Sequence, residues 1–242
     1  MADQYSRTRL LIGRRGMEKL RSARVALFGL GGVGGYAAEA LARAGIGHID
    51  LIDDDTVSLT NLNRQLLATH STIGKYKVDI AAKRIADIDP SIEVRTFKTF
   101  YLPETADQFD FSGYDYVLDA IDTVTGKLML VQAAQAAGTP IISCMGTGNK
   151  LDPTAFRVGD ISQTSVCPLA RIIRKECKKR GIAKLKVVWS EEDPIECKIA
   201  DDDPALSELP EGRNALPGSV CFVPAAAGMV LAGAVIGDIV NL

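Results

Sequence analysis

One apolar run that passes into a glycine-rich turn constrains the fold of this chain more than any other stretch. Residues 25–28 are apolar and β-prone, and they lead into Gly29-Leu-Gly-Gly-Val-Gly34, after which the pattern becomes helical. Glycines let the backbone approach a ligand closely, and the N-terminus of the next helix offers unpaired N–H groups to a phosphate. The pattern predicts a strand, a phosphate-binding turn and a helix. The glycines concerned are Gly29, Gly31, Gly32 and Gly34.

The next strand ends on an acidic residue. Ile49, Leu51 and Ile52 form the apolar part of this strand, and Asp53 follows it directly. An acidic residue about 20 positions after the glycine turn accepts hydrogen bonds from ribose hydroxyls in dinucleotide-binding folds. These two features alone are typical of a dehydrogenase.

Strands and helices alternate through about residue 145, which predicts a doubly wound, mainly parallel sheet. We therefore expect an α/β fold with a Rossmann-like sheet over residues 1–145 and a mixed C-terminal extension over 146–242, all in one domain. The predicted strands are 25–28, 49–52, 92–97, 116–118, 141–144, 156–161, 186–189 and 220–223. The predicted helices are 33–44, 77–88, 126–137, 169–180 and 225–240.

Two stretches of the second half differ from ordinary elements. Residues 220–237 carry no formal charge, but Pro224 divides them. Because a membrane span needs about 20 apolar residues, we predict a buried helix there and no membrane partner. Residues 191–218 are rich in Asp, Glu and Pro without periodicity, which predicts a mobile surface loop.

Composition limits the remaining classes. The net charge of −2 excludes nucleic-acid binding through overall charge, so any such binding needs a local basic patch. The five cysteines are scattered without a Cys-x-x-Cys pair, which is typical of reduced thiols in the cytoplasm. The chain has no Gly-x-x-x-x-Gly-Lys-Ser/Thr motif, so a P-loop does not hold the phosphates.

Charged residues follow the predicted strands at the edge where ligands bind in open parallel sheets. Asp53, Asp55 and Asp122 all follow strands, the loop with Arg64 begins there, and Lys77 opens the next helix. Arginine and lysine beside acids suit a triphosphate, because arginine forms a fork to phosphate oxygens and lysine supplies a point charge. A carboxylate such as Asp122 is a ligand for Mg²⁺. The set favours nucleotidyl transfer over hydride transfer.

Each of these residues also has a structural explanation. Glycines allow tight packing of a strand against a helix, and a carboxylate such as Asp55 caps helices. Arg64 and Lys77, taken singly, are typical surface residues. Only the joint pattern favours a site.

Five motifs together resemble the ubiquitin-activating-enzyme-like adenylating superfamily over about residues 5–145. They are Gly29-Leu-Gly-Gly-Val-Gly34, Asp53-Asp-Asp55-x-Val57, Asn61-Leu-Asn-Arg64-Gln65, Gly74-Lys-Tyr-Lys77 and Asp119-Ala-Ile-Asp122. The resemblance implies ATP binding, with Asp53 on the ribose, Asn61, Arg64 and Lys77 on phosphates, and Asp122 on Mg²⁺. It also implies a homodimer in which Arg7 reaches the ATP of the partner subunit.

The resemblance completes the set of candidate site residues. The catalytic candidates are Arg7, Arg64, Lys77 and Asp122, and Asp122 is also the metal ligand. The ATP-binding candidates are Gly29, Gly31, Gly32, Gly34, Asp53, Asp55, Asn61, Arg64, Gln65 and Lys77.

Within the superfamily, two groups differ in their sequences. Activators of sulfur-carrier proteins usually carry two Cys-x-x-Cys pairs and an Asn after the magnesium-binding acid; here the pairs are missing and Thr123 takes that position. Other stretches resemble the dehydratases that act on threonylcarbamoyladenosine in tRNA. They are Ala40-Leu-Ala-Arg-Ala-Gly-Ile-Gly47, Gly146-Thr-Gly-Asn-Lys-Leu-Asp-Pro153, Cys167-Pro-Leu-Ala170 and Gly218-Ser-Val-Cys-Phe-Val-Pro224.

This resemblance implies ATP-dependent adenylation of the threonyl carboxylate, followed by ring closure and net loss of water. Adenylation of the C-terminus of a ubiquitin-like sulfur-carrier protein remains the alternative, with a sulfur-carrier or cysteine-desulfurase partner. A third reading is a nucleotide-binding regulator without catalysis, against which the intact Arg64, Lys77 and Asp122 argue.

Residues 171–186 are strongly basic, enough for several phosphate contacts with a tRNA partner. The alternative is a solvated helix face. We expect no DNA partner. Cys167 precedes this segment and is a candidate for a thioester, but ring closure within one substrate needs none. We therefore predict structural roles for Cys167 and for Cys144.

Overall fold

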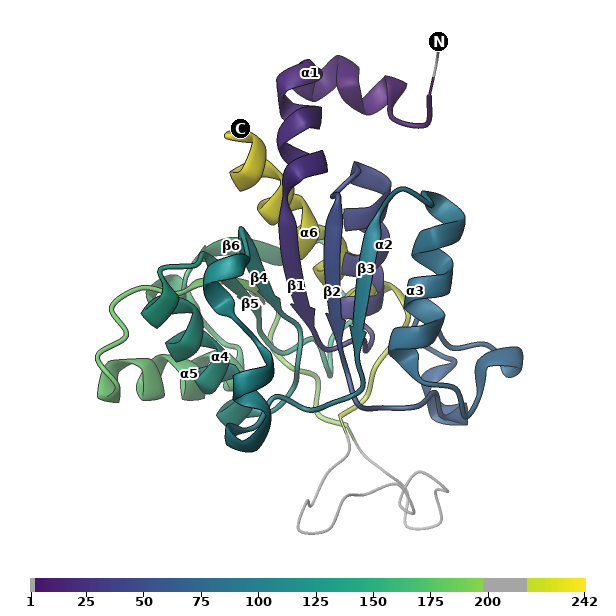
Figure 1. Cartoon of the computed structure of the whole chain (residues 1–242). Helices are drawn as coiled ribbons and strands as arrows, with labels where there is room; N and C mark the ends of the chain where they lie inside the picture. Colours follow the sequence, from purple (N-terminus) through teal and green to yellow (C-terminus); the bar gives the residue numbers. More distant parts are fainter. Residues whose placement is uncertain (1–2, 198–216) are drawn as a thin grey trace.

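The computed structural model describes residues 3–197 and 217–242. Its centre is a sheet of seven strands in the order β3-β2-β1-β4-β5-β7-β6 (Figure 1). All neighbouring pairs run parallel except β6 and β7, which are antiparallel. The predicted doubly wound, mainly parallel α/β sheet is confirmed. The strands are β1 (Arg24–Phe28), β2 (His48–Ile52), β3 (Glu93–Phe97), β4 (Tyr116–Asp119), β5 (Ile141–Cys144), β6 (Phe156–Asp160) and β7 (Lys186–Ser190).

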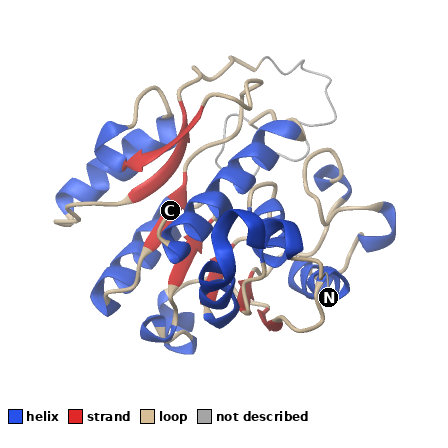
Figure 2. Cartoon of the chain, turned by 90° about the horizontal axis from the view of Figure 1, so that it is seen from above, coloured by secondary structure: helices blue, strands red, loops and turns tan. Residues whose placement is uncertain are grey.

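Helices cover both faces of the sheet, as Figure 2 shows from above. One buried cluster joins the sheet to α2, α3 and α6, and a second joins it to α4 and α5. The sheet is therefore buried on both sides, as parallel sheets require. The helices are α1 (Ser6–Ser22), α2 (Gly34–Ala44), α3 (Lys77–Ile88), α4 (Val124–Ala137), α5 (Pro168–Lys179) and α6 (Phe222–Val240).

Glycine ends two of these helices where the sequence predicted it. Gly45 after α2 has φ 89° and Gly138 after α4 has φ 73°, so both take the left-handed conformation that closes a helix C-terminus. The lead-in at residues 5–22 is α1, which bends at Gly13, where φ is 73°.

The predicted strand at 220–223 is wrong, because Phe222 and Val223 already belong to α6. Pro224 lies in the first turn of that helix, where its missing N–H costs no intrahelical hydrogen bond. The short apolar run therefore extends the helix. The predicted mobile loop at 191–218 lies mostly outside the described residues.

Helix α6 packs closely on α2. A Cβ built on Gly228 comes within 2.3 Å of the Val33 carbonyl oxygen, so only glycine fits there. By length and composition alone α6 is apolar enough to cross a membrane, and 39% of that apolar window is buried inside the protein. A core helix passes the same test, and the predicted absence of a membrane partner stays a prediction.

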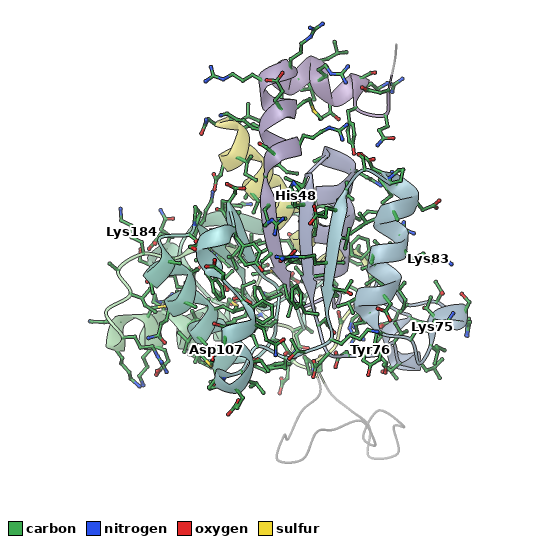
Figure 3. The ribbon with its side chains drawn as sticks, viewed as in Figure 1. His48, Lys75, Tyr76, Lys83, Asp107 and Lys184 are labelled. Atoms are coloured by element: carbon green, nitrogen blue, oxygen red, sulfur yellow. The ribbon has the colours of Figure 1, made fainter. Side chains whose placement is uncertain are left out.

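The strand order reverses between β1 and β4, whose carboxyl ends lie side by side with Phe28 opposite Asp119. Ligands bind beyond the strand ends at such a switch point. Figure 3 shows the two ends of the strands. His48 lies where β2 begins, and Tyr76 lies near the opposite end, where the strands end. The candidate residues lie at this second end.

Candidate functional site

A pocket of about 620 Å³ opens beyond the carboxyl ends of the strands. Its size is within the range of sites that hold small molecules. One wall consists of the turns after β1, β2 and β4, and the other comes from segments of residues 144–150, 167–169 and 217–219. The wall contains most of the candidates from the sequence: Gly29, Gly31, Gly32, Asp53, Asp55, Asn61, Arg64, Gln65, Lys77 and Asp122.

Two glycines of the turn are required by close packing. Gly29 has φ 90°, and a Cβ built on it comes within 2.8 Å of the Ala120 backbone. A Cβ on Gly34 comes within 1.7 Å of the Gly29 carbonyl oxygen, and Gly34 does not line the pocket. Gly34 therefore lets α2 begin directly against the turn, while Gly29, Gly31 and Gly32 face the pocket.

Asp53 organises the turn after β2. One carboxylate oxygen accepts a hydrogen bond from the Leu30 N–H at 2.6 Å, and the other accepts one from the Asp55 N–H at 2.9 Å. Burial raises the pKa of Asp53, and the charge of Lys77, 3.9 Å away, opposes this rise. The carboxylate thus ties the glycine turn to the second strand at the pocket wall.

Lys77, the first residue of α3, is nearly buried, with only 4% of its side chain exposed. Its Nζ donates to Asp55 Oδ2 at 2.5 Å. The Asp55 side chain is itself 64% exposed, so the pair opens to the pocket and to solvent. A phosphate that enters this pocket can replace Asp55 as the partner of Lys77, and the Asp55 carboxylate then stays hydrated.

The loop after β2 supplies an amide and a guanidinium. Asn61 Oδ1 accepts from the Ser58 N–H at 3.2 Å, which holds the short helical turn of this loop. Arg64 Nη1 donates to the Thr60 carbonyl at 2.8 Å, which anchors one end of its fork. Gln65 is buried, and its Oε1 has no hydrogen-bond partner among the described residues. Gln65 also lines the pocket, so its oxygen is available to accept from a hydrogen-bond donor there.

Asp122 follows β4 and lines the pocket with an exposed carboxylate that has no hydrogen-bond partner in the described part of the chain. Asp53, Asp54 and Asp55 also bring ligand atoms within 4.8 Å of one another. Two of those three carboxylates already accept from backbone N–H groups or from Lys77. A free carboxylate is what Mg²⁺ with bound phosphates prefers, so Asp122 fits this ion.

Arg7 lies outside the pocket, on the exposed side of α1. Helix α1 leads into the start of β1 (Figure 1), whereas the pocket lies beyond the ends of the strands. Arg7 therefore has no access to the pocket of its own chain.

The sequence did not predict a buried ion pair that lies beneath the pocket. Lys127 of α4 donates to Asp119 Oδ1 at 3.0 Å and to the Cys144 carbonyl at 2.7 Å, and both charged side chains are almost fully buried. Ser143 also donates to Asp119. The pair joins the ends of β4 and β5 to α4. The groups of this network come from three separate elements, so no local sequence motif reveals it.

The wall from the second half was also missing from the candidate set. Cys167 is buried at the start of α5 and lines the pocket beside Leu169. Cys144 lines it too, and burial raises the pKa of this thiol to about 12. Lys150 is nearly buried and donates to the Glu192 carbonyl. One sequence signal could have revealed this wall: a predicted strand ends shortly before the glycines of Gly146-Thr-Gly148.

With this geometry in hand, comparison with known proteins identifies the family. A model of the ThiF family matches residues 5–239. The chain belongs to the ThiF family. The ThiF match therefore covers nearly the whole chain and includes both walls of the pocket.

Two relatives are similar over nearly their full length. The tRNA threonylcarbamoyladenosine dehydratase of Bacillus subtilis is 43% identical over 250 residues, which cover 100% of this chain and 96% of the relative. The E. coli tRNA N6-threonylcarbamoyladenosine dehydratase, solved in complex with ATP, superposes with a TM-score of 0.86 at 31% identity. That match covers 98% of this chain and 94% of the other.

The similarity to proteins named adenylyltransferase and sulfurtransferase covers less of the chain. An adenylyltransferase and sulfurtransferase of Aspergillus clavatus is 38% identical over 132 residues, which cover 54% of this chain and 27% of that protein. The similarity to the Bacillus subtilis dehydratase therefore includes both walls of the pocket, whereas the similarity to the Aspergillus clavatus protein covers about half of the chain.

Proposed function

We propose that this ThiF-family protein is an ATP-dependent enzyme that cyclises threonylcarbamoyladenosine in tRNA. The observation that carries the proposal is one pocket that joins the glycine turn, Lys77, Arg64 and Asp122 to a wall from the second half. The full-length similarity to the Bacillus subtilis dehydratase supports the same substrate.

The nucleotide lies against the first wall. Gly29, Gly31 and Gly32 let the backbone approach the phosphates, and Asp53 accepts from the ribose hydroxyls. Lys77 and the free nitrogens of Arg64 bind phosphate oxygens, because a charge-assisted hydrogen bond is stronger than a neutral one.

The first chemical step joins the threonyl carboxylate to the α-phosphate of ATP and breaks the bond to pyrophosphate. Negative charge grows on the leaving pyrophosphate, and Lys77 and Arg64 offset this charge. The product is an acyl adenylate. The neighbouring carbamoyl group attacks the carbonyl carbon of this adenylate, loses one N–H proton to solvent, and displaces AMP. A ring closes, and relative to the starting nucleoside the product has lost the elements of one water.

Asp122 holds Mg²⁺ in this proposal, because its exposed carboxylate lines the pocket without a protein partner among residues 3–197 and 217–242. When bound, Mg²⁺ neutralises charge on the phosphate oxygens. Asp53 and Asp55 instead keep the wall in place through Leu30 and Lys77.

We also propose a cytoplasmic homodimer. Leu10 and Leu11 on α1 are 86% and 85% exposed, and Met229 of α6 is also exposed, which favours a second subunit over these helices. Arg7 lies on the same helix α1, away from its own pocket, in agreement with a role at the ATP of the partner subunit.

The test uses ATP, Mg²⁺ and tRNA that carries threonylcarbamoyladenosine. We expect AMP and pyrophosphate in equal amounts, and nucleoside mass spectrometry should show loss of one water from the modified adenosine. The matched control is the same tRNA without the modification, which should give neither product. Absence of cyclisation with the modified tRNA, in a protein that binds ATP, would refute the proposal.

Adenylation of a sulfur-carrier protein is the second candidate, with a cysteine desulfurase as a further partner. The position of Cys167 in the pocket wall favours it, because a thiol there suits an acyl transfer. A carrier protein ending in Gly-Gly replaces the tRNA in the same assay and distinguishes the two.

A further inference from the structure

Helix α5 is strongly basic, but its cations are not equivalent. Arg174 donates to the Thr164 carbonyl at 2.7 Å, and this bond holds the turn before the helix. Lys179 donates to Glu176 at 2.6 Å, and Arg180, just after the helix, donates to Gln132 at 3.0 Å. These three cations serve the fold of the helix and its surroundings.

The other three cations of α5 form one stripe. The side chains of Arg171, Lys175 and Lys178 are exposed and make no hydrogen bond or ion pair with any residue that the structure describes. They lie at positions i, i+4 and i+7, and residues at this spacing share one face of a helix. We call these three residues the α5 stripe. Lys184, labelled in Figure 3, lies in the loop after the helix and is exposed as well.

The stripe begins next to the pocket. Pro168 and Leu169, the first residues of α5, line the pocket wall. Arg171 lies about 4.5 Å further along the helix axis and Lys178 about 15 Å, since an α-helix rises about 1.5 Å per residue. The unpaired charge therefore runs outward from the pocket mouth. The net charge of the chain is −2, so this local charge is not part of a general excess.

We propose that the sugar-phosphate backbone of the RNA substrate lies along the α5 stripe while the reacting nucleoside enters the pocket at the N-terminus of α5. This inference rests on the proposed function. Flexible unpaired cations suit phosphates, which attract them without regard to base sequence. Base stacking is not part of the interaction, because no aromatic side chain lies within α5.

The experiment compares two triple variants with the wild-type enzyme. Arg171→Gln/Lys175→Gln/Lys178→Gln removes the stripe, and Lys83→Gln/Lys179→Gln/Arg180→Gln removes the same formal charge elsewhere. Lys83 is an exposed residue of α3 without a partner among the described residues, and the other two belong to the engaged group. All six positions are exposed, and thermal unfolding of both variants checks that each is folded before KM is compared.

Steady-state AMP release is measured against the concentration of modified tRNA at several salt concentrations. The stripe variant should raise the KM for tRNA by at least ~10-fold and lower the magnitude of the salt slope by about 2, since each lost phosphate contact removes about 0.7 to 0.9. Its kcat at saturating tRNA and its affinity for ATP should stay at the wild-type values. The control variant should change KM less than ~3-fold.

An unchanged KM and salt slope in the stripe variant would overturn the docking proposal, and so would an equal loss in both variants. Both results leave the proposed function intact, because the wild-type enzyme still turns over modified tRNA. If the wild-type enzyme binds ATP but does not act on modified tRNA, the proposed function and the docking surface fail together.

Discussion

Two buried lysines pair with acids near the carboxyl ends of the strands, and the two lysines have different partners. Lys77 pairs at 2.5 Å with Asp55, which is 64% exposed and lines the pocket. Lys127 pairs at 3.0 Å with Asp119, which is fully buried, and its Nζ also donates to the Cys144 carbonyl. Lys127 does not line the pocket.

The exposure of the partner carboxylate decides whether a buried lysine is available to a ligand or is needed for the fold. A lysine whose partner is hydrated can exchange that partner for a phosphate at little cost. A lysine whose partner is buried cannot, because the carboxylate left behind would be an unpaired charge in the core. We therefore assign Lys77 to the nucleotide and Lys127 to the positions of β4, β5 and α4.

The turn after β4 carries both roles within four residues, and its pocket side gives the largest expected effect. Asp119 faces the core pair, and Asp122 faces the pocket. If Asp122 holds Mg²⁺ as proposed, Asp122→Ala should lower kcat at least ~10³-fold, since loss of the metal would remove several kcal/mol of charge stabilisation at ~1.4 kcal/mol per tenfold. Thermal unfolding without nucleotide should match the wild type, because Asp122 has no partner in the described residues.

Asp54→Ala is the matched control for this variant, because Asp54 is also exposed and lines the pocket. It should change kcat less than ~3-fold. If Asp54→Ala abolishes turnover and Asp122→Ala does not, the metal belongs to the cluster of Asp53, Asp54 and Asp55.

Lys127→Met tests the core side. It should lower the free energy of unfolding by ~3–5 kcal/mol, because it leaves Asp119 buried and unpaired. For a chain of this length the midpoint of thermal unfolding should fall by roughly 6–20 °C. The double variant Asp119→Asn/Lys127→Met should recover part of the loss. A single variant with wild-type unfolding but no activity would move Lys127 from the fold to the chemistry.

Lys77→Met tests the pocket side of the comparison. It should lower kcat/KM by ~10²–10³-fold, since one charge-stabilising donor is lost. The unfolding midpoint without ATP should fall less than in Lys127→Met, because Asp55 remains hydrated and the buried Asp53, 3.9 Å from Lys77, keeps its two backbone N–H donors. Lys83→Met, an exposed position of the same helix, should change neither quantity. A large loss of stability in Lys77→Met would erase the distinction between the two lysines.

Cys167→Ala should have the smallest effect, a change in turnover of less than ~3-fold. Cys167 is buried where α5 meets the pocket, and ring closure within the substrate requires no thioester. Turnover is measured as AMP release with modified tRNA. Complete loss of turnover in a folded protein would instead support a covalent intermediate on this sulfur.

The two lysines also show what the sequence can and cannot predict. Lys77 was found because it opens a helix next to a recognisable loop, and both cues are local. Lys127 was missed because its partners are Asp119, Ser143 and the Cys144 carbonyl, and only the packing of α4 on β4 and β5 brings these groups together.

The fold itself followed from periodicity, because long alternating segments specify strands and helices reliably. The run at 220–223 was misassigned since periodicity alone does not separate a short buried strand from the start of a buried helix. The second pocket wall was missed for a different reason. Residues such as Leu169 line a pocket through chain topology and carry no chemical signature of their own.

The most direct test of the central claim is exchange of labelled pyrophosphate into ATP. The wild-type enzyme should catalyse exchange only with tRNA that carries threonylcarbamoyladenosine, because the acyl adenylate forms on that carboxylate and its formation is reversible. Lys127→Met should retain exchange at a temperature where it is folded, and Lys77→Met should lose it. Exchange that requires a carrier protein ending in Gly-Gly and ignores modified tRNA would contradict the account.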